Sequence, residues 1–170
     1  MRCILLTGDY GAGKTAVAME MSQQLSEAGL RSATVDMDWL AWVGPDLSLA
    51  ELRSLKGQNL ATVVTNFRSF GIDHLVLAGM LKTAHDRGRV AGAVGECEFT
   101  VVRLLVTRDE ARRRIAAQDV GQELKERLAD ADEIAAAVEA ANVEDFTVDN
   151  QGASSIEEVA REVLSRCEWL

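Results

Sequence analysis

The chain has 170 residues, of which 48% are apolar and 26% charged, and these values are typical of one globular domain over residues 1–170. Its formal net charge of −9 argues against a nucleic-acid-binding protein, because contact with a phosphate backbone requires a basic surface. No apolar run approaches the length of a membrane span and no signal-peptide pattern is present, so we expect a cytoplasmic protein without a membrane partner.

Short apolar runs alternate with helical patterns along the chain, which indicates a parallel sheet covered by helices. The first strand is predicted over residues 3–7, and a helix over residues 14–28 follows it and ends at Gly29. Further strands are predicted over residues 32–36, 74–79, 100–107 and 145–149. The expected fold is therefore a three-layer α/β/α domain with a five-stranded parallel sheet.

The last helix is predicted near residues 155–168. Ser154 and Glu157 have the spacing of a capping box at its start. Its apolar stripe consists of Ile156, Val159, Val163 and Cys167. This stripe predicts a helix that packs on the sheet, and Pro45 predicts a turn much earlier in the chain.

The segment GDYGAGKT at residues 8–15 fits the phosphate-binding pattern G-x-x-x-x-G-K-[ST] at every fixed position. Glycines let backbone N–H groups turn toward phosphate oxygens, and the start of the following helix attracts the same anion. Lys14 is expected to reach the β and γ phosphates, and the Thr15 hydroxyl is expected to bind Mg²⁺. The predicted nucleotide-binding residues are Gly8, Tyr10, Gly11, Ala12, Gly13, Lys14, Thr15 and Ala16. The motif indicates the P-loop nucleoside triphosphate hydrolase fold.

A dinucleotide site is the nearest alternative, because the acidic residue Asp36 ends the second predicted strand. Such a site has the pattern G-x-G-x-x-G, whereas the glycines here stand at positions 8, 11 and 13. Lys14 and Thr15 then follow directly, and this pair favours a nucleoside triphosphate.

Asp36 and Asp38 end the second predicted strand and lie two residues apart. In an extended segment such residues project to the same side, and ligands of parallel sheets bind at the carboxyl ends of the strands. Two carboxylates there can hold Mg²⁺ and accept the proton of an attacking hydroxyl group. A solvated turn or a helix cap is the alternative interpretation of the pair.

The phosphate loop, the D-x-D segment and an arginine-bearing stretch before the last strand together resemble the small P-loop kinases. This group includes shikimate, gluconate and adenylylsulphate kinases, chloramphenicol phosphotransferase and the nucleoside monophosphate kinases. The resemblance implies a substrate-binding insertion over about residues 39–59 and a short lid over about residues 112–127. It also implies that the catalytic residues are Lys14, Asp36, Asp38 and Arg114, with Asp38 as the base and Asp36 beside the metal ion.

The same resemblance assigns the remaining binding residues. Acceptor binding falls to Asp38, Arg53, Arg68 and Gly79, and the adenine side to Arg114, Asn150 and Gly152. Two positions depart from the family pattern, because Gln118 stands where a second lid arginine is expected and no acidic residue follows Gly79. The cations that could replace the missing lid arginine are Arg112, Arg113 and Arg127.

These features predict an ATP-dependent phosphotransferase that moves the γ-phosphoryl group to a hydroxyl of a small molecule, with ATP and Mg²⁺ as cofactors. A nucleoside or nucleotide kinase is an alternative, although Lys82 is the only cation close after the third strand. A nucleotide-binding regulator with weak ATPase activity is a second alternative, which the departures at Gln118 and Gly79 motivate. A GTPase is disfavoured, because VDNQG lacks the lysine of the guanine-reading motif. The sequence leaves a monomer and a homodimer equally open.

Overall fold

A parallel five-stranded sheet forms the centre of the computed structural model, which describes residues 1–44, 47–118, 121–152 and 154–170. The strand order is β2-β3-β1-β4-β5, and every pairing is parallel. The strands are β1 (Arg2–Thr7), β2 (Ser32–Asp36), β3 (His74–Ala78), β4 (Glu98–Leu105) and β5 (Phe146–Asp149). The predicted sheet is confirmed, with β4 beginning two residues earlier than expected.

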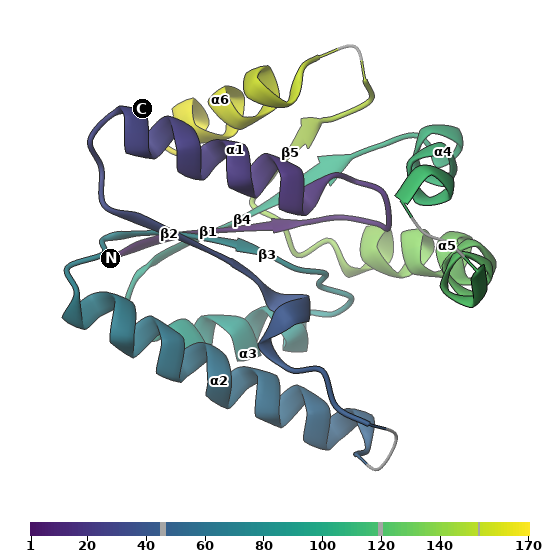
Figure 1. Ribbon diagram of the computed structural model, residues 1–170, viewed down its shortest axis with the longest axis horizontal. Helices are drawn as coiled ribbons and strands as arrows, with labels where there is room; N and C mark the ends of the chain where they lie inside the picture. The colour runs from purple at the N-terminus through teal and green to yellow at the C-terminus, as the bar shows by residue number, and fades with distance from the viewer. Residues whose placement is uncertain (45–46, 119–120, 153) are drawn as a thin grey trace.

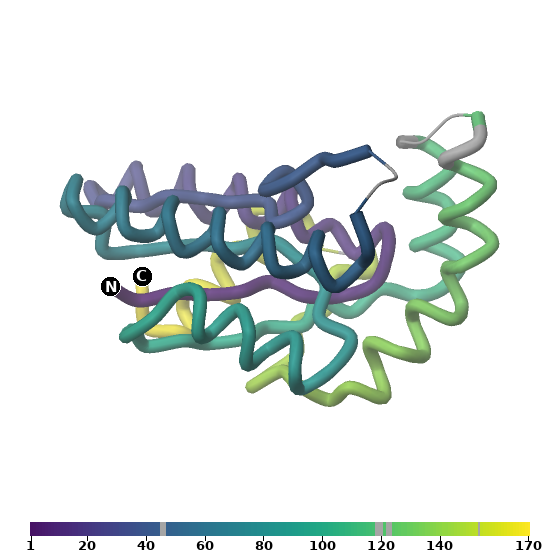
Figure 2. Tube along the Cα trace, turned by 90° about the horizontal axis from the view of Figure 1, so that it is seen from below, coloured from purple at the N-terminus to yellow at the C-terminus, as the bar shows by residue number. Residues whose placement is uncertain are grey.

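Helices cover both faces of this sheet, which confirms the three-layer α/β/α architecture (Figure 1). The elements are α1 (Lys14–Glu27), the 3-10 helix η1 (Met37–Leu40), α2 (Leu49–Ser69), α3 (Ala84–Val94), α4 (Arg108–Gln118), α5 (Gly121–Ala141) and α6 (Ile156–Arg166). α1 and α6 lie on one face and α2 and α3 on the other. α4 and the first part of α5 stand at one end of the molecule (Figures 1 and 2). None of the helices in the described ranges combines the length and apolar composition needed to cross a membrane.

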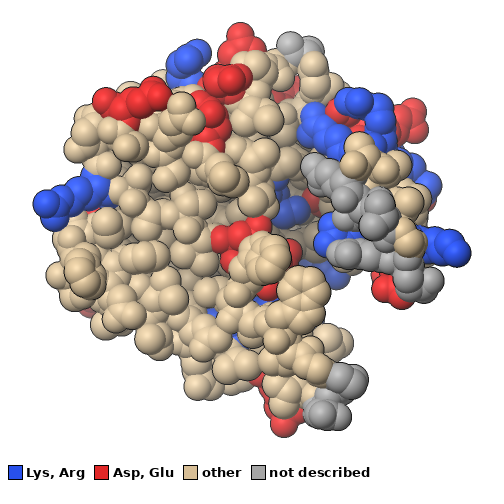
Figure 3. Space-filling model, in the orientation of Figure 1, with Lys and Arg blue, Asp and Glu red and all other residues tan. Residues whose placement is uncertain are grey.

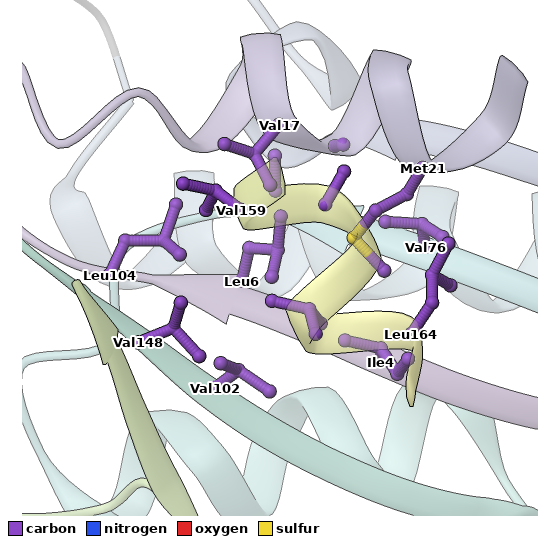
Figure 4. Close-up of a cluster of buried hydrophobic side chains, with 14 of the residues drawn as sticks. Ile4, Leu6, Val17, Met21, Val76, Val102, Leu104, Val148, Val159 and Leu164 are labelled. Atoms are coloured by element: carbon purple, nitrogen blue, oxygen red, sulfur yellow. The ribbon is translucent and has the colours of Figure 1, made fainter. Parts of the chain in front are cut away.

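The two faces of β1 contribute to two separate hydrophobic clusters. Ile4 and Leu6 point to the layer of α1 and α6, where they pack with residues such as Met21 (Figure 4). Cys3 and Leu5 point to the layer of α2 and α3. A central parallel strand is apolar on both faces, and this burial explains why the CILL run shows no alternation of polar and apolar residues.

The ends of α1 and α6 show how local sequence fixes the helices. Gly29 stops α1 with a positive φ of 76°, as predicted. At the start of α6 the capping box consists of Ser155 and Glu158, one residue later than the predicted pair. The buried stripe is also displaced, and it consists of Val159, Ala160, Val163 and Leu164. Ile156 stays 44% exposed.

α2 is one continuous helix of 21 residues that carries both Arg53 and Arg68. It begins at a capping box formed by Ser48 and Glu51. Both arginines therefore lie on the same rod, fifteen residues or about 22 Å apart along its axis. The turn expected at Pro45 lies outside the described residues.

Candidate functional site

The phosphate loop connects β1 to α1 and has the geometry that its glycines permit. Gly8, Gly11 and Gly13 all have positive φ angles, of 145°, 72° and 81°. A Cβ atom at Gly11 would lie 2.6 Å from the carbonyl oxygen of Ala111. A Cβ atom at Gly13 would lie 2.6 Å from Nδ2 of Asn150. The loop therefore requires glycine both for its backbone angles and for the close approach of neighbouring elements.

Lys14 begins α1 and turns back over the loop. Its Nζ donates hydrogen bonds to the carbonyl oxygens of Gly8 at 2.9 Å and Asp9 at 2.8 Å. Desolvation is the main reason that the pKa of Lys14 falls to about 8, while the charges of Asp38, Asp9 and Asp36 raise it. In the nucleotide-free protein, Lys14 thus donates its hydrogen bonds to two neutral carbonyl oxygens. Phosphate oxygens are stronger acceptors because they are charged, so they can replace these carbonyl oxygens as partners of Lys14.

Thr15 and Asp36 meet at the end of β2. The Thr15 Oγ1 donates a 2.6 Å hydrogen bond to Oδ2 of Asp36, while Oδ1 of Asp36 accepts the backbone N–H of Asp38 at 2.9 Å. The second contact makes Asp36 the N-cap of η1, so residues 36–38 do not form the extended segment that the sequence analysis assumed. A hydroxyl and a carboxylate are hard oxygen ligands, and this donor set suits Mg²⁺.

Asp38 lines a cavity of about 180 Å³ that lies between α2, α3 and the end of β3. Its side chain is 86% exposed, and one oxygen lies 3.7 Å from Nζ of Lys56. Arg53 lines the same cavity, so the structure brings these two predicted acceptor residues together. The charged lining consists of Asp38, Arg53, Lys56, Lys82, Asp86 and Arg89. Four cations against two carboxylates favour an anionic ligand.

Three of these lining residues were missed by the sequence analysis. Lys56 follows Arg53 by three residues on α2, which places both on one helix face. Asp86 and Arg89 repeat this spacing on α3. The i, i+3 spacing of charged residues could therefore have indicated a charged face on each helix. It identifies a shared cavity only when the two helices are known to face each other.

Arg68 and Gly79 occupy different places from those expected. Arg68 donates to the carbonyl oxygens of Val94 at 2.9 Å and Glu96 at 2.7 Å, at the end of α2 remote from Arg53. This arginine connects α2 to the end of α3, and its contact with the acceptor stays a prediction. Gly79 is buried beneath Met37, whose Sδ would lie 2.7 Å from an added Cβ. The following residues Met80 and Lys82 line the cavity instead.

On the other side of the loop, Arg114 and Asn150 fasten the loop backbone. Arg114 donates from Nη1 to the carbonyl oxygen of Gly11 at 3.2 Å and from Nη2 to that of Asn150 at 2.8 Å. Asn150 is 3% exposed and donates from Nδ2 to the carbonyl oxygen of Ala12 at 2.8 Å. The Glu110 carboxylate accepts hydrogen bonds from Arg113 and Arg114. These hydrogen bonds lower the pKa of Glu110 to about 2.

A cavity of about 300 Å³ lies beside this network. Its lining includes Gly13, Ala16, Arg114, Asn150 and Gly152, all of which were predicted to bind the nucleotide. The structure thus brings the residues predicted for the adenine side together next to the phosphate loop. The expected departure at Gln118 concerns a side chain outside the described part of the structure.

α4 and α5 form the arginine-rich end of the molecule, and they overlap the predicted lid of residues 112–127. Lys and Arg side chains gather over this region in Figure 3. Arg112 on α4 pairs with Asp132 on α5 at 2.9 Å. Arg127 on α5 lies over the ring of Tyr10 in the phosphate loop, with its guanidinium 5.5 Å from the ring centroid.

The sequence model of the family described as adenylylsulphate kinase matches residues 1–120, which include the phosphate loop, the Asp36–Asp38 segment, α2 and α4. The chain belongs to the adenylylsulphate kinase family. The resemblance to small P-loop kinases is confirmed, and this member is an ATP-dependent small-molecule kinase. The protein accordingly uses ATP.

Solved structures of other kinases share the fold of this adenylylsulphate kinase family member. The APS kinase of Mycobacterium tuberculosis in complex with AMPPNP and APS is 24% identical, with a TM-score of 0.62 over 98% of this chain and 97% of that one. Shikimate kinase from Bacteroides thetaiotaomicron is 20% identical, with a TM-score of 0.70 over 98% of each chain. A sugar kinase from Janibacter sp. is 17% identical, with a TM-score of 0.69 over 99% and 95%. No curated protein matches the sequence.

Proposed function

We propose that this kinase transfers the γ-phosphoryl group of ATP to a hydroxyl group of a small anionic molecule. The observation that carries the proposal is the cavity whose lining combines the Asp38 carboxylate with the cations Arg53, Lys56, Lys82 and Arg89. Asp36 connects this cavity to the phosphate loop, because its carboxylate accepts hydrogen bonds from the Thr15 hydroxyl and from the N–H of Asp38. An acceptor bound there would lie beside the transferred group.

The chain's own residues supply positioning and charge. Lys14 leaves the carbonyl oxygens of the loop and contacts the β and γ phosphates. Arg114 and Asn150 hold the loop backbone in place while it binds the triphosphate. Thr15 and Asp36 would hold Mg²⁺, which would offset phosphate charge when bound.

Asp38 is proposed as the base in this transfer. Its carboxylate accepts the proton of the acceptor hydroxyl as that oxygen forms a bond to the γ phosphorus. The bond between the γ phosphorus and the bridging oxygen breaks, and ADP leaves with its electron pair. Arg53, Lys56, Lys82 and Arg89 are proposed to bind the anionic part of the acceptor. This arrangement favours sugar acids and similar hydroxylated anions over uncharged alcohols.

A coupled ADP-release assay tests the proposal with a panel of sugar acids, shikimate, APS, nucleoside monophosphates and neutral polyols. We expect at least one hydroxylated anion to raise ADP release above the basal rate and neutral polyols to leave it unchanged. Asp38→Asn should lower the stimulated rate by about 10²-fold or more and keep the Kd of ATP. The proposal fails if no acceptor raises the rate while ATP binds, or if only nucleoside monophosphates do so and they accept the group on their phosphate.

A further inference from the structure

The acceptor cavity, which is the cavity lined by Asp38 and Arg53, lies between α2 and α3. Each of these helices connects two parallel strands of the sheet, so the two run in the same direction, and they pack side by side on one face of the sheet (Figure 1). Along α2, the charged lining residues Arg53 and Lys56 come first. The uncharged lining residues Gly57 and Leu60 follow one turn later.

The lining residues of α3 follow the same order. Asp86 and Arg89 come first, and Val90 and Ala93 follow them. Leu60 and Val90 are 1% and 5% exposed, and both belong to the hydrophobic cluster between these helices and the sheet. The cavity therefore has a charged outer end at the starts of the two helices and an apolar inner end between them.

Gly57 lies where the charged part of the lining meets the apolar part. It is an interior residue of a continuous helix, where glycine is less favourable than alanine. A Cβ atom added at Gly57 meets no atom within 4 Å, so no neighbouring group requires a glycine at this position. The missing side chain instead leaves open space in the cavity that Gly57 lines.

We propose that the acceptor carries a short alkyl or aryl group beside its anionic group, and that Gly57 determines specificity by leaving room for this apolar group. The inference deepens the proposed function and rests on it, because it assumes that this cavity binds the acceptor. The anionic group contacts the cations of the outer end, and the apolar group contacts Leu60 and Val90. Hydroxylated anions with an apolar group are thus favoured over those with a hydroxyl on every carbon, since an apolar wall gives hydroxyls no hydrogen-bond partner.

The volume of the cavity limits the size of the apolar group. The whole cavity measures about 180 Å³. An apolar cavity of about 150 Å³ can hold benzene, so a single phenyl ring is the largest group that we expect to enter. A propyl group fits with room left for the anionic group.

Three 2-hydroxycarboxylates test the substrate class on the purified protein with AMPPNP bound, by NMR titration. Glycolate has no side group, 2-hydroxypentanoate carries a propyl group, and gluconate carries a hydroxyl on every carbon of its chain. We expect 2-hydroxypentanoate to bind at least about tenfold more tightly than glycolate, because each buried methylene contributes about fourfold in Kd. Equal Kd values for these two acids, or tighter binding of gluconate than of 2-hydroxypentanoate, would overturn the inference.

Gly57→Leu fills the space at Gly57 and changes no charge. We expect the Kd of 2-hydroxypentanoate to rise to that of glycolate, while the Kd values of glycolate and ATP stay within about twofold of wild type. Gly57→Ala should give an intermediate preference and raise the melting temperature by about 2–4 °C, because alanine is the better helix former. An unchanged preference in Gly57→Leu would contradict the role of Gly57.

Gly88 provides the matched control on α3. A Cβ atom added there also meets no atom within 4 Å, but Gly88 is exposed and does not line the cavity. Gly88→Ala should raise the melting temperature by a similar amount, and Gly88→Leu should keep the wild-type preference for 2-hydroxypentanoate. If Gly88→Leu loses this preference as fully as Gly57→Leu, the effect does not arise in the cavity and the inference fails.

The outcomes separate this inference from the proposed function. If the wild-type protein phosphorylates a hydroxylated anion without any preference for an apolar group, only the inference fails. If no hydroxylated anion is phosphorylated, the proposed function fails. The ratio of the Kd values for glycolate and 2-hydroxypentanoate, in wild type and in Gly57→Leu, then still decides whether Gly57 makes room for an apolar group.

Discussion

Thr15 Oγ1 donates a 2.6 Å hydrogen bond to Oδ2 of Asp36, which joins the first turn of α1 to the last residue of β2. The same carboxylate accepts the N–H of Asp38 through its other oxygen. One side chain therefore sets the position of the proposed metal-binding hydroxyl and the direction of the chain toward the proposed base. A change at Asp36 should affect both.

Replacing Asp36 by Asn removes the charge and keeps the size of the side chain. We expect the Mg²⁺ concentration needed for half-maximal ADP release to rise by about 10- to 100-fold, because a ligand set that loses its anion binds a cation less well. Thr15→Ala should shift the same titration, and Thr15→Ser should not. Asp149→Asn, which changes the last residue of β5, is the control, and an equal shift in that variant would contradict the metal role of Asp36.

The pKa of Lys14 predicts how ATP binding depends on pH. This pKa is lowered from 10.5 to about 8, mainly by desolvation, so the nucleotide-free protein loses the ammonium proton as the pH rises through 8. Phosphate binds the protonated form, so the Kd of ATP should be steady between pH 7 and 7.5 and rise by up to about tenfold per pH unit above 8. Titration calorimetry in two buffers at pH 8.5 should also detect proton uptake. Lys14→Arg should remove this dependence, and a flat wild-type profile up to pH 9.5 would contradict the prediction.

Gly11 and Gly29 provide a matched pair for the packing of α4 against the loop. Both have positive φ angles, 72° and 76°, but a Cβ at Gly11 meets the Ala111 carbonyl whereas one at Gly29 meets nothing within 4 Å. Gly29→Ala should destabilise the fold by about 1 kcal/mol from its backbone angle alone. Gly11→Ala should lower the melting temperature by a further ~4 °C or more and weaken ATP binding, because α4 must move. Equal melting temperatures would show that α4 does not press on the loop.

Ser155 and Ser154 test which serine begins α6. The Ser155 hydroxyl accepts the N–H of Glu158, so Ser155→Ala should destabilise the protein by about 1 kcal/mol, or roughly 2–4 °C in melting temperature. Ser154→Ala should change it by less than about 0.5 kcal/mol. The opposite order of the two variants in thermal denaturation would restore the earlier assignment of the cap.

The fold was predictable to the extent that the sequence signals are local. Buried strands such as β1 appear as continuous apolar runs, and the phosphate loop is a contiguous motif. The capping box was ambiguous, because Ser154–Glu157 and Ser155–Glu158 have the same spacing. Burial of Ala160 and Leu164 against the sheet decides between them, and that contact depends on the whole packed layer.

The candidate site was predictable only in part for a related reason. Lys14, Thr15 and Asp36 belong to segments whose roles follow from one motif and one strand end. The acceptor cavity combines residues of η1, α2, α3 and the segment after β3. Lys56 and Arg89 can therefore be recognised as lining residues only when the packing of those elements is known. Arg68 shows the converse, since its charge serves the contact between α2 and α3.

The fluorescence of the three tryptophans reports on two different regions of the protein. Trp39 follows Asp38 directly, and it and Trp42 are 74% and 81% exposed with their rings 5.7 Å apart, whereas Trp169 is 6% exposed and lies against His74. A soluble quencher should therefore reduce the fluorescence of Trp39 and Trp42 and leave that of Trp169 unchanged. Emission from Trp39 and Trp42 will follow the entry of an acceptor without any attached label, while that of Trp169 follows only the integrity of the sheet.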